Sequence, residues 1–252
     1  MNTLEKNTLT GTSNFRMLAK IIESRGIKEE DPDACPVCGG TGYVFKRNKK
    51  GYVYSYECNA CNMIKKERIS LLLNVAQLPE VKIALAPHVQ SLKYVSNFCN
   101  DRPNWMIFTG KTGSGKTTEA TWVAKKLIEE KGAYARFYNA YDLTRQLIAT
   151  KRRIDEHEEL IDEIKNLDLM ILDDFLKTIP QQGSFSYAEF VEATLEIVWT
   201  RYDVRKPLII TTQSSIKALT SFDSALAGRI VELSQDYVIV FDNQSKNWRV
   251  SP

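Results

Sequence analysis

The segment WMIFTGKTGSGKTTEA, at residues 105–120, constrains the fold of this 252-residue chain more than any other. An apolar stretch leads into the pattern G-x-x-x-x-G-K-[ST], which runs from Gly110 to Thr117, and an amphipathic stretch follows it. In this order of strand, glycine-rich loop and helix, backbone N–H groups converge at the positive end of the helix, where phosphate groups bind. The segment therefore predicts a nucleotide site at the edge of a parallel sheet.

The loop residues predicted to surround the phosphates are consecutive: Gly110, Lys111, Thr112, Gly113, Ser114, Gly115, Lys116, Thr117 and Thr118. The Lys116 ammonium is expected to reach the β and γ phosphates, and the Thr117 hydroxyl is expected to ligate Mg²⁺. ATP and Mg²⁺ are therefore the expected cofactors of this part of the chain.

From Asn104 onward, apolar strands alternate with amphipathic helices, which is typical of a parallel sheet covered by helices. Strands are predicted at 105–109, 134–139, 168–173, 208–212 and 237–241, and helices near 117–130, 141–151, 187–203 and 215–233. The predicted fold class is α/β, a P-loop domain at 104–252 with a five-stranded parallel sheet.

An acidic pair, Asp173 and Asp174, lies at the end of the predicted strand at 168–173. A buried parallel strand delivers the residues at its end to the carboxyl edge of the sheet, where the phosphate loop also lies. Asp173 is expected to complete the magnesium shell, and Asp174 to orient and deprotonate the attacking water. A turn or a helix cap is the alternative interpretation of such a pair.

Four cysteines before the P-loop domain form the pattern C-x2-C-x19-C-x2-C: Cys35, Cys38, Cys58 and Cys61. Two such pairs suit a structural zinc ion with four thiolate ligands, and the alternating residues 43–57 between them predict a hairpin, so residues 34–64 are interpreted as a zinc ribbon. Free thiols or disulfides are the alternative. Cys99, which stands alone, is expected to be a small buried residue.

The remaining N-terminal segments are predicted to be helical. Residues 1–33 contain one amphipathic helix ending near Gly26, which either docks on a partner or packs on its own protein. Residues 65–103 are expected to form a linker of two or three helices, with breaks at Pro79 and Pro87. Because neither a long apolar segment nor a signal peptide is evident, the chain is predicted to be cytoplasmic, with no membrane contact.

Positive charge is concentrated in the cysteine segment. From Tyr43 to Arg68, seven Lys and Arg residues face Glu57 and Glu67, a net charge of +5 before any metal is counted. A run such as KRNKK, at 46–50, indicates either a solvated hairpin face or a contact with nucleic acid.

Four segments in order, WMIFTGKTGSGKT, YARFYNAYDL, DLMILDDF and RYDVRKPLIITTQSS, resemble the DnaC and DnaI group of helicase-loader ATPases in the AAA+ superfamily, over about residues 90–250. The resemblance implies a sheet in the AAA+ order with a minimal lid or none, and a slow, partner-stimulated ATPase that associates with copies of itself. It also implies that the protein delivers a replicative helicase onto single-stranded DNA, with the zinc module docking on the helicase.

The resemblance assigns three further residues. Gln213 stands where the family usually has an asparagine that positions the water, although capping of the next helix equally explains the neighbouring Thr212. Arg229 is the only arginine between the fourth and fifth predicted strands, the interval that supplies a finger to a neighbouring subunit, and a surface ion pair is its alternative. Arg249 stands where loaders place a second sensing arginine.

Two other classes share parts of this pattern. A transposition helper ATPase of the IstB type has the same ATPase motifs, with a transposase as its partner. A P-loop nucleoside kinase with a zinc lobe is the metabolic alternative. Basic and aromatic residues of the helix at 141–153 are candidates for DNA contact. Pairing with the acidic segment 155–163 explains those bases equally well.

Overall fold

Five parallel strands form the centre of the molecule in the computed structural model, which describes residues 35, 37–38, 42–47, 53–81, 86–99, 104–177 and 186–241. In spatial order they are β4 (Ala135–Asn139), β5 (Leu169–Phe175), β6 (Leu208–Thr212), β3 (Trp105–Gly110) and β7 (Val238–Phe241). Each adjacent pair is parallel. The predicted α/β fold class is therefore confirmed, and every predicted strand is present within two residues of its expected bounds.

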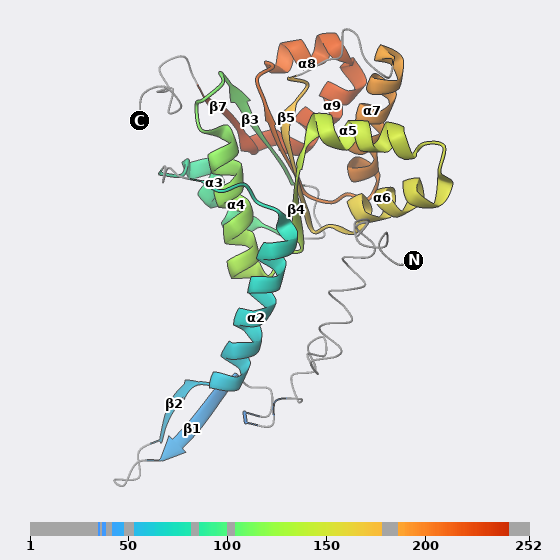
Figure 1. Cartoon of the computed structure of the whole chain (residues 1–252). Coiled ribbons are helices and arrows are strands. Elements are labelled where there is room, and N and C mark those ends of the chain that lie inside the picture. Colours follow the sequence, from blue (N-terminus) through green and yellow to red (C-terminus); the bar gives the residue numbers. More distant parts are fainter. Residues whose placement is uncertain are drawn as a thin grey trace, which may run out of the picture.

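Helices cover both faces of this sheet (Figure 1). One layer consists of α2 (Asn59–Ala76), α3 (Val89–Asn97) and α4 (Lys116–Lys131). The other consists of α5 (Ala140–Thr150), α6 (Ile154–Asn166), α7 (Tyr187–Asp203) and α9 (Ser224–Ser234), with α8 (Ile216–Phe222) packed on α9. The short 3₁₀ helix η2 (Gln235–Tyr237) leads into β7.

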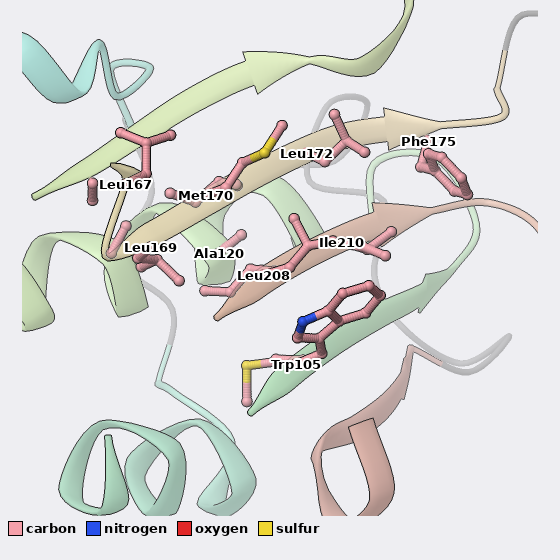
Figure 2. Packing of buried hydrophobic residues seen from close by; sticks show 14 of the residues in the cluster. Trp105, Ala120, Leu167, Leu169, Met170, Leu172, Phe175, Leu208 and Ile210 are labelled. Carbon is pink, nitrogen blue, oxygen red and sulfur yellow. The ribbon is translucent and has the colours of Figure 1, made fainter. Parts of the chain in front are cut away.

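The centre of the core is formed by strand residues that are buried between the two helical layers, and helix residues such as Ala120 pack against them (Figure 2). The first four residues of β5, from Leu169 to Leu172, have no exposed surface, and neither do Leu208, Ile209 and Ile210 of β6. Continuous apolar runs of this kind are expected where helices cover both faces. At the start of β3, the Trp105 indole is fully buried and donates a hydrogen bond of 3.0 Å to the Lys206 carbonyl.

Three features differ from the sequence-based expectations. Helix α6 was not predicted because its acidic residues were interpreted as charge partners, yet Leu160 and Ile164, four residues apart, are buried on one face. The helix predicted at 215–233 is two helices, because Asp223 ends α8 and its carboxylate caps α9 by accepting from Leu226 N–H at 2.6 Å. Cys99 is exposed, since it lies beyond the end of α3.

A small hairpin lies at the far end of α2 from the sheet (Figure 1). Strands β1 (Tyr43–Arg47) and β2 (Val53–Glu57) pair antiparallel, as predicted. Helix α2 follows β2 directly. At its C-terminal end, Leu72 and Ala76 are buried in the same core as the sheet. The turn of the hairpin and the amphipathic helix predicted within residues 1–33 lie outside the described residues.

Candidate nucleotide site

The phosphate loop connects β3 to α4 in a conformation that its glycines permit. Gly110, Gly113 and Gly115 have φ values of 139°, 78° and 103°, which side chains rarely adopt. A Cβ atom on Gly110 would lie 2.3 Å from the Phe241 carbonyl oxygen of the neighbouring strand. Only glycine fits this position, because the loop must turn sharply beside β7.

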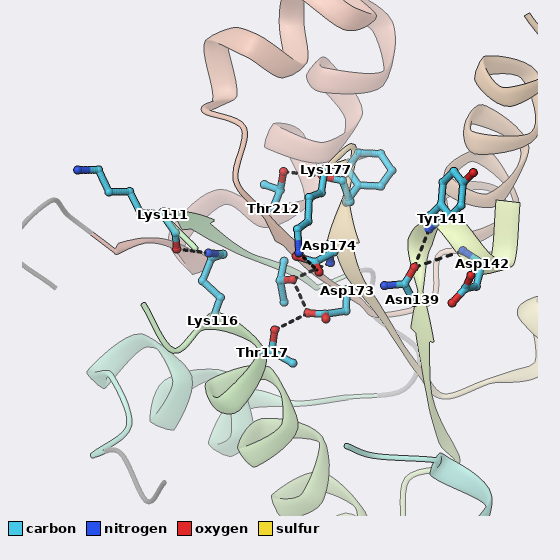
Figure 3. Close-up of polar contacts among 12 residues, drawn as sticks. Lys111, Lys116, Thr117, Asn139, Tyr141, Asp142, Asp173, Asp174, Lys177 and Thr212 are labelled. Carbon is cyan, nitrogen blue, oxygen red and sulfur yellow. Dashed lines mark hydrogen bonds and ion pairs between the residues drawn. The ribbon is translucent and has the colours of Figure 1, made fainter. Parts of the chain in front are cut away.

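Lys116 begins α4, and its ammonium group folds over the loop. The Nζ atom donates hydrogen bonds of 2.8 Å to the Gly110 carbonyl and of 2.6 Å to the Lys111 carbonyl, the second of which is drawn in Figure 3. The Ser114 hydroxyl also donates to the Lys111 carbonyl, at 2.9 Å. The lysine is therefore held at the loop, where the motif requires a cation for phosphate. Lys111 and Thr112 are exposed, and Thr118 is half-buried.

Asp173 lies opposite the loop, at the end of β5, and accepts two hydrogen bonds (Figure 3). The Thr117 hydroxyl donates at 2.8 Å and the Thr211 hydroxyl of β6 at 2.5 Å, both to Oδ1. Burial raises the pKa of this carboxyl above its usual range, and the two hydroxyl donors oppose that shift. The structure thus brings together the two residues predicted to hold Mg²⁺. A hydroxyl and a carboxylate are suitable oxygen ligands for that ion.

Thr211 was not predicted to contact the acidic pair. Its buried hydroxyl donates to Asp173 and also accepts a hydrogen bond of 3.0 Å from the Asp174 backbone N–H. The signal in the sequence was a threonine pair at the end of an apolar strand, but its partner depended on which strands are neighbours. Thr212, the next residue, donates to the Phe175 carbonyl at 2.8 Å.

Asp174 has a different environment from Asp173. Its φ of 56° lies in the left-handed region, at the shift in register between β5 and β6. Its carboxylate, about one quarter exposed, forms an ion pair of 2.7 Å with Lys177 (Figure 3). A left-handed backbone at a non-glycine residue carries a cost of about 1–3 kcal/mol. At this left-handed position the carboxylate contacts Lys177, which was not among the predicted site residues.

The residues assigned by resemblance are spread over the molecule. Gln213 directly follows β6 and is exposed. Arg229 lies on α9, where its guanidinium carbon is 5.8 Å from the Trp199 ring centroid and 5.2 Å from that of Tyr202. The structure therefore places Arg229 on aromatic rings of α7 and not in the nucleotide site of its own chain. Arg249 lies outside the described residues.

Basic residues at the end of α5 form ion pairs within the chain. Lys151 contacts Glu192 of α7 at 2.6 Å, and Arg153 contacts Glu156 of α6 at 2.7 Å. The second pair is the alternative that the acidic segment 155–163 suggested. On the same helix, Arg145 lies over the Tyr141 ring, 5.9 Å from its centroid.

A buried carboxylate connects the phosphate loop to the preceding helix. Glu119, in the first turn of α4, accepts hydrogen bonds from His88 N–H at 2.8 Å and from the Ser91 hydroxyl at 2.5 Å. Its other oxygen contacts His88 Nδ1 at 2.5 Å, and the His88 ring packs on Phe241 at 4.9 Å between centroids. This contact network was not anticipated, because its residues belong to separate predicted segments.

The four predicted zinc ligands are close together. Their Sγ atoms all lie within 4.8 Å of one another, with Cys35 and Cys58 3.8 Å apart and Cys38 and Cys61 3.4 Å apart. Tetrahedral Zn–S bonds of about 2.3 Å require sulfur atoms about 3.8 Å apart, so the four positions fit zinc. Backbone N–H groups of Cys38 and Val37 lower the pKa of Cys35 to about 6, whereas hydrogen bonds with Cys35 and Cys38 raise that of Cys61 to about 12. A bound cation would let all four ionise together.

A phosphate loop, a facing acid and a sheet in the order β4-β5-β6-β3-β7 define a P-loop nucleotide-binding protein of the AAA+ type. The family of IstB-like ATP binding proteins matches residues 66–233, and the chain belongs to this family. The family includes the DnaC-like AAA+ proteins, as the resemblance predicted.

Two curated relatives come from Bacillus subtilis (strain 168). The uncharacterized protein YqaM is 26% identical over 68% of this chain and 54% of its own length. The phage-like element PBSX protein XkdC is 26% identical over 55% of this chain and 51% of its own length. The alignments thus span about half the length of these relatives. A DnaC helicase loader structure is similar in fold, with a TM-score of 0.50, 21% identity and coverage of 63% of this chain and 94% of that chain.

Among the helices of the described residues, none combines the length and the apolar character that a membrane span requires.

Proposed function

We propose that this protein is an ATPase that binds a replicative hexameric helicase and delivers it onto single-stranded DNA. The observation that carries the proposal is the contact of Asp173 with Thr117 across the phosphate loop, in a fold similar to nearly the whole of a DnaC helicase loader chain. Membership of an ATP-binding family supports the nucleotide, and the loader-like fold supports the helicase.

In this proposal, each residue around the loop has a distinct task. Lys116 transfers its hydrogen bonds from the loop carbonyls to the β and γ phosphates, and Thr117 and Asp173 hold Mg²⁺. Asp174 accepts the proton of the attacking water, which requires that Lys177 first leave its carboxylate. Because Lys177 neutralises Asp174 in the nucleotide-free chain, slow hydrolysis without a partner is expected. Gln213 orients the water from the end of β6.

We further propose that Arg229 acts on the nucleotide of a neighbouring copy. Its position on Trp199 and Tyr202 leaves its own phosphate loop without this cation, so a second subunit is needed to bring the two together. A mixture of Arg229→Ala and Lys116→Ala proteins should hydrolyse ATP, since each supplies what the other lacks. Arg205→Ala, which removes another arginine stacked on Tyr202, is the matched control for a purely structural loss. A mixture as inactive as its two components would contradict action in trans.

The zinc ribbon is proposed to dock on the helicase, with zinc holding the fold of the module. We also propose that ATP favours an assembled state and that hydrolysis releases the partner. Arg249 would sense the γ phosphate within this assembly.

Helicase loading on a closed circle of single-stranded DNA tests the main proposal. The hexameric helicase of the same host is mixed with the circle, ATP and this protein, and unwinding of an annealed strand is measured. Wild-type protein should allow unwinding and Lys116→Ala should not, whereas Lys125→Ala, an exposed lysine on the same helix, should behave as wild type. Unwinding that does not depend on the added protein would overturn the loader function.

A second candidate, a transposition helper, is favoured by the family match itself, because the family description names IstB. The two functions differ in the partner that ATP recruits. An integration assay with a transposase from the same host, with Lys116→Ala as the negative control, distinguishes them.

A further inference from the structure

Glu119 is a buried acidic residue of α4 whose carboxylate contacts the start of α3. Only 3% of its surface is exposed. One carboxylate oxygen accepts hydrogen bonds from His88 N–H and from the Ser91 hydroxyl, and the other oxygen contacts His88 Nδ1. A carboxylate is costly to bury without such partners. The start of α3 therefore supplies the contacts that keep this group in the interior.

Helix α3, which the structure describes over its whole length, does not cap its own N-terminus with an acid. Its first turn contains no acidic residue, and the side chain of its N-cap residue, His88, caps no backbone group. A helix N-terminus carries unpaired N–H groups and a partial positive charge, and a nearby carboxylate stabilises both. Glu119 provides this carboxylate from α4. The first turns of the two helices are therefore joined through one side chain.

The turn of α4 that bears Glu119 also carries the residues expected to bind phosphate and Mg²⁺. Lys116 and Thr117 are the first two residues of the helix. The Glu119 backbone N–H closes this turn by donating to the Gly115 carbonyl at 2.9 Å. A contact that fixes Glu119 therefore also restricts the backbone that presents Lys116 and Thr117.

His88 connects the same contacts to the beginning of the phosphate loop. Its ring packs edge-on against the Phe241 ring, with 4.9 Å between the centroids. The Phe241 carbonyl oxygen lies beside Gly110, where an added Cβ atom would be 2.3 Å from it. Through Phe241 and Glu119, His88 thus contacts the neighbours of both ends of the loop.

The negative charge of Glu119 does not by itself favour nucleotide. Phosphate groups bind at the positive end of a helix, and an acidic side chain in the first turn of that helix repels them. Any benefit of Glu119 to nucleotide binding therefore comes from its hydrogen bonds and not from its charge.

We propose that Glu119 is a positioning residue for the phosphate loop, and that nucleotide bound at the loop stabilises the first turn of α3 through its carboxylate. Coupling between two sites is reciprocal in free energy, so a contribution of α3 to nucleotide affinity implies an equal effect of nucleotide on α3. The inference rests on the nucleotide site of the proposed function. It requires no helicase, DNA or hydrolysis.

Titration of the full chain with a fluorescent ATP analogue and Mg²⁺ tests the positioning role. Glu119→Ala should weaken the affinity at least about tenfold, the factor for one lost hydrogen bond to a charged group. Glu119→Gln should bind at least as tightly as wild type, because its amide oxygen still accepts from His88 N–H and Ser91 while the charge is removed. Glu130→Ala, at an exposed position of the same helix, is the matched control and should bind as wild type.

Ser91→Ala tests the same contact from the side of α3. It removes one donor to Glu119 and leaves every residue of the loop unchanged, so it should weaken the affinity by about two- to tenfold. Affinities are compared under conditions in which urea unfolding shows each protein to be folded. If Glu119→Ala does not fold, Ser91→Ala carries the test. Folded Glu119→Ala or Ser91→Ala protein that binds as tightly as wild type would overturn the positioning role.

Hydrogen exchange of the full chain measures the reciprocal effect. Saturation with the same analogue should slow amide exchange at residues 88–92 in wild type and in Glu119→Gln, but not in Glu119→Ala. Equal slowing in Glu119→Ala, or no slowing in wild type that binds the analogue, would overturn the coupling. If wild-type protein does not bind the analogue at all, the nucleotide site of the proposed function is itself wrong, and this inference is refuted with it.

Discussion

Replacing Thr211 by valine tests the contact that joins the acidic pair to β6. Valine has the shape of threonine but no hydroxyl, so it removes the donor to Asp173 Oδ1 and the acceptor for Asp174 N–H. A hydrogen bond to a charged group contributes about 1.5–3 kcal/mol, and an orphaned buried N–H costs about 1–3 kcal/mol. Since the two losses share one site and are not additive, we expect Thr211→Val to lower the free energy of unfolding by about 2–5 kcal/mol.

Urea unfolding followed by circular dichroism measures this difference, with Thr211→Ser as the matched control. Serine keeps the hydroxyl and removes one buried methyl group, so it should cost about 1 kcal/mol. The deficit of the valine protein should also shrink as the pH falls, because a protonated Asp173 no longer needs the donor to stabilise a charge. A valine protein as stable as the serine protein would refute the importance of this hydroxyl.

Four further changes test the nucleotide site and the cysteine module. Gly110→Ala should destabilise the fold by more than about 1 kcal/mol in urea, because its Cβ would meet the Phe241 carbonyl, whereas Gly228→Ala in the open surface of α9 should not. Because burial raises the folded pKa of Asp173 above its unfolded value, nucleotide-free protein should gain stability as the pH falls through that raised pKa, and Asp173→Asn should flatten this dependence in thermal melts. Lys177→Gln should raise ATP hydrolysis without a partner, measured as phosphate release, and Lys177→Arg should not. Removing zinc with a chelator should abolish the ellipticity of the hairpin while binding of a fluorescent ATP analogue persists.

The sheet and the phosphate loop were predictable because their signals are local. The uninterrupted apolar run that ends in Asp173 is typical of a buried parallel strand, which delivers the residue at its end to the edge of the sheet, and the glycines permit the loop beside it. The cysteine spacing was equally local. In each case, the residues that carry the signal lie within one continuous stretch of sequence, which for the zinc ligands runs from Cys35 to Cys61.

Contacts between distant segments were not predictable in the same way. Thr211 contacts Asp173 only because β6 is the neighbour of β5 in the sheet. Arg201 is fully buried, and its guanidinium donates to three backbone carbonyls, those of Ile164, Leu167 and Pro207. An arginine in an amphipathic helix is normally interpreted as solvent-exposed. Burial lowers the pKa of Arg201 to about 9. The hydrogen bonds of its guanidinium join the end of α6 to the segment that leads into β6.

Contacts within one helical layer join the cysteine module to the nucleotide site. Helix α2 carries the hairpin at one end and buries Leu72 and Ala76 against the sheet at the other, in the layer that also contains α4. Within that layer, Glu119 holds the start of α3 to the first turn of α4, two residues after Thr117. Asp174 and Lys177 instead lie at the end of β5, before the segment that leads to α7. Lys116 belongs to the layer that bears the hairpin and Asp173 to the sheet, so a nucleotide bound between these two residues would contact both.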